Sequence, residues 1–244
     1  MKQSKIDRRK KYILTLDVET ANGLQYPLVY DLGFSISDKK GRIYEEGSFI
    51  IDEIWSQKNL MQSSYYAKKI PEYEKEIAQG LHKVVKFNYA RTHVRKLVDK
   101  YNVRQVSAYN LKFDLGALNG TSYNLNRSAF SHFFSHDQRK RMEKVDIWTL
   151  ACKTIFIQKR FSSFCLENGF VSEAGNFKTN AEVAYAFMKN DCNFSETHKG
   201  LADVKIEVEI MAHAYKQHKY VGDKYEWKPW KIINNHLKYG SAIK

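Results

Sequence analysis

Residues 12–20 alternate between two kinds of side chain with the period of a β-strand. One face is apolar from Tyr12 to Val18 and requires a core, whereas the opposite face ends in Asp17 and Glu19. Ligands bind at strand ends in sheets that helices cover. Two carboxylates this close repel each other and resist desolvation, and a divalent cation relieves both effects. Taken alone, the pair is equally typical of acidic loop residues after a strand, so its meaning depends on partners elsewhere in the chain.

The chain has 244 residues, 43% of them hydrophobic, which predicts one globular domain with an ordinary core. Its formal net charge is +13 and its pI is about 9.4. This excess favours a polyanionic partner, with nucleic acid ahead of an acidic membrane surface. A basic protein without such a partner is the less favoured alternative.

The three cysteines are widely spaced and form no C-x-x-C pair, which is typical of reduced thiols rather than a disulfide framework or a zinc site. The basic N-terminus is not followed by the apolar segment of a signal peptide, and no apolar run could span a bilayer. We therefore expect a cytoplasmic protein with no membrane partner.

The order of elements predicts an α/β domain. Three β-rich segments at 12–20, 28–37 and 42–51 are separated by short loops, which indicates an antiparallel meander. Helical patterns then alternate with two further strand candidates at 104–109 and 145–148, and the longest helix is expected at 200–218. We divide the chain into a basic arm (1–11), a domain (12–218) with a probable insertion or lid at 119–143, and a basic aromatic tail (219–244).

Two further motifs follow predicted elements. In the first, a strand leads into Asn110-Leu111-Lys112-Phe113-Asp114, so that Asp114 lies near the start of a helix. In the second, His198 precedes the longest helix and Asp203 lies in its first turns. By itself, Asp114 could simply offset a helix dipole, and His198 could be a helix cap.

Together, the three motifs resemble the DEDDh branch of the DEDD 3′→5′ exonucleases, which includes the proofreading subunit of bacterial DNA polymerase III and the oligoribonucleases. Asp17 and Glu19 match the first motif, Asp114 matches the second, and His198 and Asp203 match the third. The chain departs from the family at Tyr109, where histidine is frequent, and at Gly200, where alanine is usual. Neither departure removes a ligand.

The resemblance implies an RNase H-like fold with a mixed five-stranded sheet, made of three antiparallel N-terminal strands plus parallel strands, and helices on both faces. It implies two divalent cations, Mg²⁺ or Mn²⁺, held by Asp17, Glu19, Asp114 and Asp203, with His198 as the general base. It also implies substrate contacts by Thr20, Leu24, Asn110 and Phe113.

The expected activity is hydrolysis from single-stranded 3′ ends, DNA preferred, releasing 5′-mononucleotides. An RNA-trimming enzyme of the same family, an endonuclease of related fold and a catalytically silent nucleic-acid-binding module stay open as alternatives. A polymerase or a second copy of the chain is a possible partner, and a proofreading or phage context is compatible with the family. The basic residues at 83–100 and 139–144 are candidates for phosphate contacts. Candidates for base stacking are Phe130, Phe133, Phe134, Trp227 and Trp230.

Overall fold

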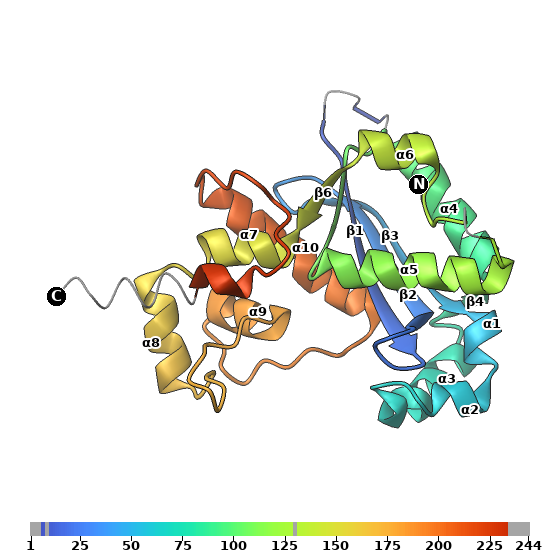
Figure 1. The fold of residues 1–244 in the computed structure, drawn as a ribbon, viewed down its shortest axis with the longest axis horizontal. Coiled ribbons are helices and arrows are strands. Elements are labelled where there is room, and N and C mark those ends of the chain that lie inside the picture. The colour runs from blue at the N-terminus through green and yellow to red at the C-terminus, as the bar shows by residue number, and fades with distance from the viewer. Residues whose placement is uncertain (1–5, 8–9, 129–130, 234–244) are drawn as a thin grey trace.

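The computed structural model describes residues 6–7, 10–128 and 131–233, which form a mixed α/β domain (Figure 1). Its strands are β1 (Ile13–Ala21), β2 (Leu28–Ser37), β3 (Ile43–Ile51), β4 (Lys83–Val85), β5 (Gln105–Ala108) and β6 (Glu143–Asp146). Its helices are α1 (Asp52–Trp55), α2 (Lys58–Met61), η1 (Ala67–Lys69), α3 (Ile70–Ala78), α4 (Phe87–Lys100), α5 (Leu111–Asn126), α6 (His136–Arg141), α7 (Ile147–Thr154), α8 (Lys159–Glu167), α9 (Ala181–Lys189) and α10 (Gly200–Lys216). None of the described helices has both the length and the apolar composition needed to cross a bilayer.

The described strands form one six-stranded sheet in the order β4-β3-β2-β1-β5-β6. The predicted meander of β1, β2 and β3 is confirmed as antiparallel, and β5 and β6 add to β1 in parallel. The predicted number of five strands is wrong, because Lys83–Val85 pairs in parallel with the end of β3. Three residues are too few to show a strand period, and the neighbouring lysines made this segment look like part of a basic helix.

The alternation of β1 divides the core into two layers. Tyr12, Leu14, Leu16 and Val18 pack with α4 and α5 on one face, whereas Ile13 packs with α7, α9 and α10 on the other. In Figure 1, α5 crosses in front of the sheet and α10 lies behind it. Asp17 and Glu19 have the same phase as Ile13, so they face α10.

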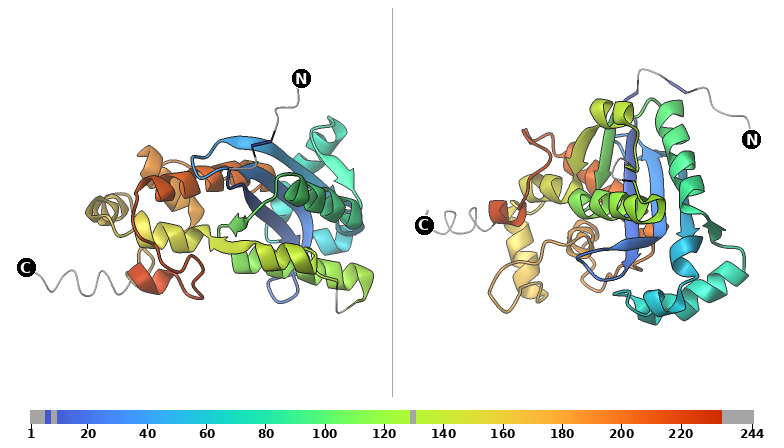
Figure 2. Two further views of the ribbon diagram at one scale, coloured as in Figure 1. Left: turned by 90° about the horizontal axis from the view of Figure 1, so that it is seen from above. Right: turned by 45° about the vertical axis from the view of Figure 1, so that its right-hand side comes forward.

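The small helices α1 to α3 lie together at one end of the strands (Figure 2). Since β1 and β3 both run antiparallel to β2, they are parallel to each other, and their carboxyl ends lie at the same end of the sheet. The chain that leaves β3 into α1, α2 and η1 is therefore placed beside the acidic end of β1.

The described part of residues 119–143, for which we predicted an insertion or lid, packs closely against the rest of the domain. Helix α5 continues to Asn126, and Phe133 and Phe134 are buried in the core. The Arg95 guanidinium on α4 donates to the carbonyls of Phe133 and His132, at 2.6 and 2.8 Å. This segment therefore packs against α4, and its two buried rings are unavailable for base stacking. Phe130 lies outside the described residues.

The tail is described as far as Ile233, which is buried. The Trp230 ring stacks on Trp148 with their centroids 5.4 Å apart, and the Asp146 N–H donates to the Lys224 carbonyl at 2.8 Å. The tail thus lies along α7 and β6. Residues 234–244 and most of the arm at 1–11 lie outside the described residues.

Candidate active site

One cavity of about 340 Å³ brings the three motifs together. Asp17 and Glu19 reach it from β1, Asp114 from α5, and His198 and Asp203 from the start of α10. Asp17 and Asp203 are 186 positions apart in the sequence (203 minus 17). The fold alone therefore makes these residues neighbours. Of the predicted substrate contacts, Thr20, Leu24 and Phe113 also line the cavity.

Helix α5 is fixed by hydrogen bonds from both sides. One oxygen of Asp146, at the end of β6, accepts hydrogen bonds from the N–H groups of Asn110 and Leu111, both at 3.0 Å. Asp146 thereby satisfies two backbone donors that would otherwise be unpaired at the helix start. At the other side, the Val18 N–H donates to Asp114 Oδ1 at 3.2 Å, which joins the second motif to the first.

The start of α10 lies directly against β2, where Gly33 faces Gly200. A Cβ atom at Gly33 would lie 2.1 Å from the Gly200 backbone, and a Cβ atom at Gly200 would lie 2.6 Å from the Gly33 nitrogen. An alanine at position 200 would therefore clash in this chain. Buried Asp31 completes the contact, since it accepts hydrogen bonds from the Gly200 N–H at 3.1 Å and from the Tyr73 hydroxyl at 2.7 Å.

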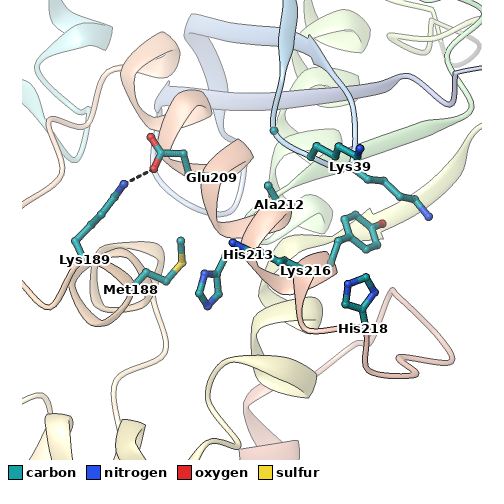
Figure 3. A pocket seen from close by; sticks show the side chains of 11 residues that line it. Lys39, Met188, Lys189, Glu209, Ala212, His213, Lys216 and His218 are labelled. Atoms are coloured by element: carbon teal, nitrogen blue, oxygen red, sulfur yellow. Dashed lines mark ion pairs between the residues drawn. The ribbon is translucent and has the colours of Figure 1, made fainter.

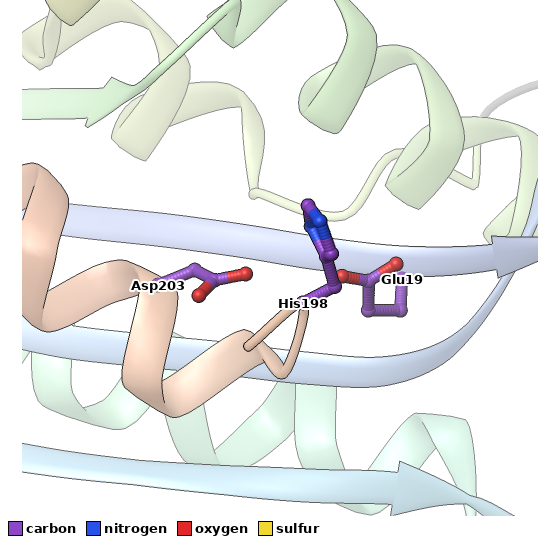
Figure 4. Close-up of side chains that lie close together, drawn as sticks. All are labelled: Glu19, His198 and Asp203. Carbon is purple, nitrogen blue, oxygen red and sulfur yellow. The ribbon is translucent and has the colours of Figure 1, made fainter. Parts of the chain in front are cut away.

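Glu19, His198 and Asp203 each place a ligand atom within 4.8 Å of the others (Figure 4). Beside them, Asp17 Oδ2 is buried without a hydrogen-bond partner among the described residues. An unpaired buried carboxylate oxygen is costly, and a cation satisfies it. Oxygen donors in this number suit Mg²⁺ or Mn²⁺, so the residues fit the predicted metal site.

The acidic side chains of the cavity hold their protons more tightly than ordinary carboxylates. Burial is the main cause, and mutual repulsion adds to it. These effects raise the pKa of Asp17 well above its ordinary range and that of Glu19 to about 9. Burial also raises the pKa of Asp114, and raises that of Asp203 to about 6. The Lys69 ammonium lowers the pKa of Glu19 and Asp203 in part. A bound divalent cation would reverse this pattern by favouring the ionised forms.

His198 is held at the mouth of the cavity by an aromatic neighbour. Its ring stacks on Tyr66 with centroids 4.1 Å apart and planes at 15°, and its backbone is left-handed with a φ of 49°. Burial, followed by the charge of Lys69, lowers the pKa of the imidazole. His198 is therefore neutral near pH 7, which is the state that accepts a proton.

Several residues of the cavity escaped the motif search. Tyr65 and Tyr66 come from the loop before η1, Glu196 precedes His198, and Glu207 lies on α10. Burial raises the pKa of Glu196 to about 8. The tyrosines carry no signal in the sequence, whereas the spacing of four residues between Asp203 and Glu207 places both on one helix face and could have revealed Glu207.

Asn110 does not line this cavity. Its left-handed backbone, with a φ of 71°, starts α5, and it lines a neighbouring hollow of about 240 Å³ beneath the tail. Trp227 and Trp230 line the same hollow and are exposed on its rim.

A larger hollow, of about 890 Å³, lies at the opposite end of α10 (Figure 3). It is lined mainly by basic side chains, and Glu209 beside it is paired with Lys189 at 2.6 Å. Without a group of unpaired carboxylates among its lining residues, this hollow cannot hold a cation pair. The smaller acidic cavity is therefore the candidate active site.

The mixed sheet with helices on both faces is the RNase H-like fold of exonucleases. Solved structures of exonuclease I share this fold. E. coli exonuclease I in complex with a 5cy-dT13 oligonucleotide matches with a TM-score of 0.52 and 12% identity, over 96% of this chain and 45% of that chain. The zinc-bound form of the E. coli exonuclease I–ssDNA complex gives 0.51 and 12%, over 86% and 41%. Exonuclease I from Methylocaldum szegediense gives 0.53 and 13%, also over 86% and 41%.

This chain thus spans less than half the length of these three solved structures. No protein-family model and no curated protein matches the sequence. At such low identity the likeness establishes the fold, and the chemistry must be argued from the residues of this chain.

Proposed function

We propose that this chain is a metal-dependent 3′→5′ exonuclease that hydrolyses single-stranded nucleic acid, DNA preferred, and releases 5′-mononucleotides. The observation that carries the proposal is the convergence of Asp17, Glu19, Asp114, His198 and Asp203 on one cavity. Solved structures of the same fold contain single-stranded DNA oligonucleotides, which supports DNA as the substrate. The direction of hydrolysis rests on the resemblance of the motifs to the DEDDh branch.

The four aspartate and glutamate side chains of the motifs would hold two divalent cations, Mg²⁺ or Mn²⁺. Bound cations of this kind activate a water molecule and offset the charge that develops on the phosphate. Asp17 would help to hold both cations, which is supported by the electrostatic effect of Asp114, Glu19 and Asp203 on its carboxylate. Glu19 and Asp203 would hold the cation on the side of the attacking water, and Asp114 would support the other.

His198 would accept the proton of the attacking water at a ring nitrogen. Its lowered pKa keeps that nitrogen free near neutral pH, and a ring nitrogen within 4.8 Å of carboxylate oxygens of Glu19 and Asp203 supports this role. The Tyr66 ring limits rotation of the imidazole by stacking on it.

The rest of the cavity suits the end of a nucleotide chain. Leu24 is 80% exposed at the rim and Phe113 lines the wall, so both present apolar surface to a terminal base. Thr20 adds a hydroxyl at the rim. The cavity volume of about 340 Å³ is at the small end of the range for ligand sites, which favours a strand end over a duplex.

The proposal is tested with 5′-labelled single-stranded DNA, the matching RNA and circular single-stranded DNA, each with Mg²⁺ or Mn²⁺ or with EDTA. We expect the 5′-labelled DNA to shorten one nucleotide at a time from its 3′ end as unlabelled mononucleotides are released, the RNA to shorten more slowly, and the circles to stay intact. Asp17→Asn should reduce hydrolysis by about 10³-fold or more, since it removes a ligand of both cations. Asp137→Asn, which changes an exposed aspartate on α6, is the control and should be fully active.

Cleaved circles would indicate an endonuclease, and faster release from RNA would indicate the exoribonuclease alternative. Binding of DNA without products would indicate a silent binding module. Full activity of Asp17→Asn would reject the site itself.

A further inference from the structure

Glu207 is a buried acid of the candidate active site that the motifs do not include. It lies one helical turn after Asp203 on α10 and lines the same cavity with 3% of its surface exposed. Because residues four apart share a helix face, Asp203 and Glu207 both point towards β1 and its carboxylates. Among the carboxylates that act electrostatically on Asp17, Glu207 has the largest effect.

The two carboxylate oxygens of Glu207 differ in their surroundings. The carboxylate accepts a hydrogen bond from the Tyr109 backbone, whereas Oε2 is buried without a partner among the described residues. The charged groups that act on Glu207 include Asp114, Glu196 and Asp203, all of them acidic. Glu207 thus combines an unpaired buried oxygen with acidic neighbours in the same cavity.

Two other buried carboxylates, those of Asp31 and Asp146, accept several hydrogen bonds from protein donors. Asp31 accepts hydrogen bonds from Tyr73 and Gly200, and Asp146 accepts bonds from Asn110, Leu111 and Thr149. These two residues hold elements together. Asp31 Oδ1 is also buried without a described partner, but Asp31 does not line the cavity. Glu207 and Asp17 each keep such an unpaired oxygen and both line the cavity. Burying such an oxygen is unfavourable unless a ligand satisfies it.

We propose that Glu207 is a metal ligand of this site. Its Oε2 oxygen would hold one of the divalent cations together with Asp17. This inference rests on the proposed function and extends it. The site then has a carboxylate from the interior of α10 in addition to those of the three motifs. The extra negative charge should strengthen cation binding, so that the metal is retained at lower concentrations than the motif residues alone would allow.

The test is Mn²⁺ binding by the full chain without nucleic acid, measured by electron paramagnetic resonance and by calorimetry. Glu207→Gln keeps the size of the side chain but loses the charge. We expect this variant to bind Mn²⁺ about 10-fold more weakly or worse, in line with the loss of a metal-supporting residue. The matched control is Glu209→Gln, which makes the same change on an exposed face of the same helix and should bind like the wild type. Thermal melts in EDTA show that each variant is folded.

Unchanged Mn²⁺ binding by folded Glu207→Gln would overturn the inference while leaving the proposed function intact. Absence of Mn²⁺ binding by the wild type would overturn both. Crystals of the wild type soaked in Mn²⁺ provide a measurement that needs no variant. Anomalous scattering should place a Glu207 oxygen in the coordination shell, at about 2.2 Å from a cation. Cations bound by the motif residues with Glu207 outside their coordination shells would refute the inference.

Discussion

At the scale of single residues, identical carboxyl groups have different tasks because their donors differ. Asp31 and Asp146 are buried among hydroxyl and backbone donors, so they stabilise the fold. Asp17 and Glu207 each keep a buried oxygen without a partner within the described structure, and both line the cavity with other acids. Asp31 also has one unpaired oxygen but does not line the cavity, so an unpaired buried oxygen within the cavity lining distinguishes the candidate ligands from the structural acids.

The first prediction concerns His198 as general base. His198→Ala should lower kcat on single-stranded DNA by about 10²-fold or more, with little change in KM, since it removes a proton acceptor and no carboxylate ligand. The wild-type rate should fall only below the ordinary histidine pKa of about 6.5, because burial lowers the pKa of His198. The pH profile of kcat checks both points.

His136→Ala is the control, since His136 is exposed on α6 and does not line the cavity. A wild-type rate in His198→Ala between pH 6 and 9 would exclude the role.

The sequence predicted the acidic residues better than their surroundings. Asp17, Glu19, Asp114, His198 and Asp203 were chosen from motif order, and the structure brings them to one cavity. Motifs record residues at short spacing, so they could not reveal Tyr66 or Lys69, which approach from a segment with no pattern of its own. Asn110 was expected at the substrate but instead begins α5 at a neighbouring hollow.

At the scale of elements, the contact between Gly33 and Gly200 sets the position of α10. Two backbones approach each other here closely enough to exclude any side chain on either one. The start of the helix, with His198 before it and Asp203 within it, is consequently aligned against β2.

We predict that Gly33→Ala lowers the free energy of unfolding by about 1–3 kcal/mol, the usual cost of overpacking a core. It should also reduce hydrolysis, because α10 must move away from β1. Gly116→Ala on α5 is the matched control, since its Cβ atom meets nothing within 4 Å. This control should raise stability by about 0.5–1 kcal/mol, as alanine favours helix. Denaturant melts and the exonuclease assay measure both effects, and a stable, active Gly33→Ala would contradict the predicted contact.

Periodicity predicted the long elements well and the short ones poorly. The meander and α10 carry enough residues for their patterns to be distinctive, and both are present. Strand β4 has only three residues. In the segment after Asn126, polar residues and phenylalanines are mixed without a regular period. Its burial depends on Arg95 donating to backbone carbonyls, a tertiary contact that no local pattern encodes.

At the scale of the whole molecule, the acidic cavity should make stability depend on pH and metal together. The folded state raises the pKa of Glu19 to about 9, whereas unfolded glutamate titrates near 4.3. Between these values the folded protein binds more protons than the unfolded chain, so its stability falls as pH rises. Burial lowers the pKa of His198, His93 and His213. This effect makes the stability of the fold rise with pH, but only below about pH 6.5, where unfolded histidine titrates.

We therefore predict that Tm in EDTA decreases from pH 6.5 to 8.5, and that saturating Mg²⁺ raises Tm most at the upper end of this range. Glu19→Gln should flatten the decrease in EDTA, whereas Glu209→Gln, an exposed change on α10, should not. Differential scanning calorimetry at four pH values measures this, and a Tm that rises with pH in EDTA would disprove the argument.

The tail also has a consequence for how copies of the chain behave in a crowded solution. Strand β6 is an edge strand of the sheet. The unpaired backbone groups of an edge strand can pair with a strand from another molecule. Its Asp146 N–H is already bonded to the Lys224 carbonyl, and the Lys224 ammonium pairs with Glu143 at 2.8 Å. At the other end, β4 is only three residues long. Both borders of the sheet are thereby poor templates for strand addition, which protects the protein against edge-to-edge aggregation.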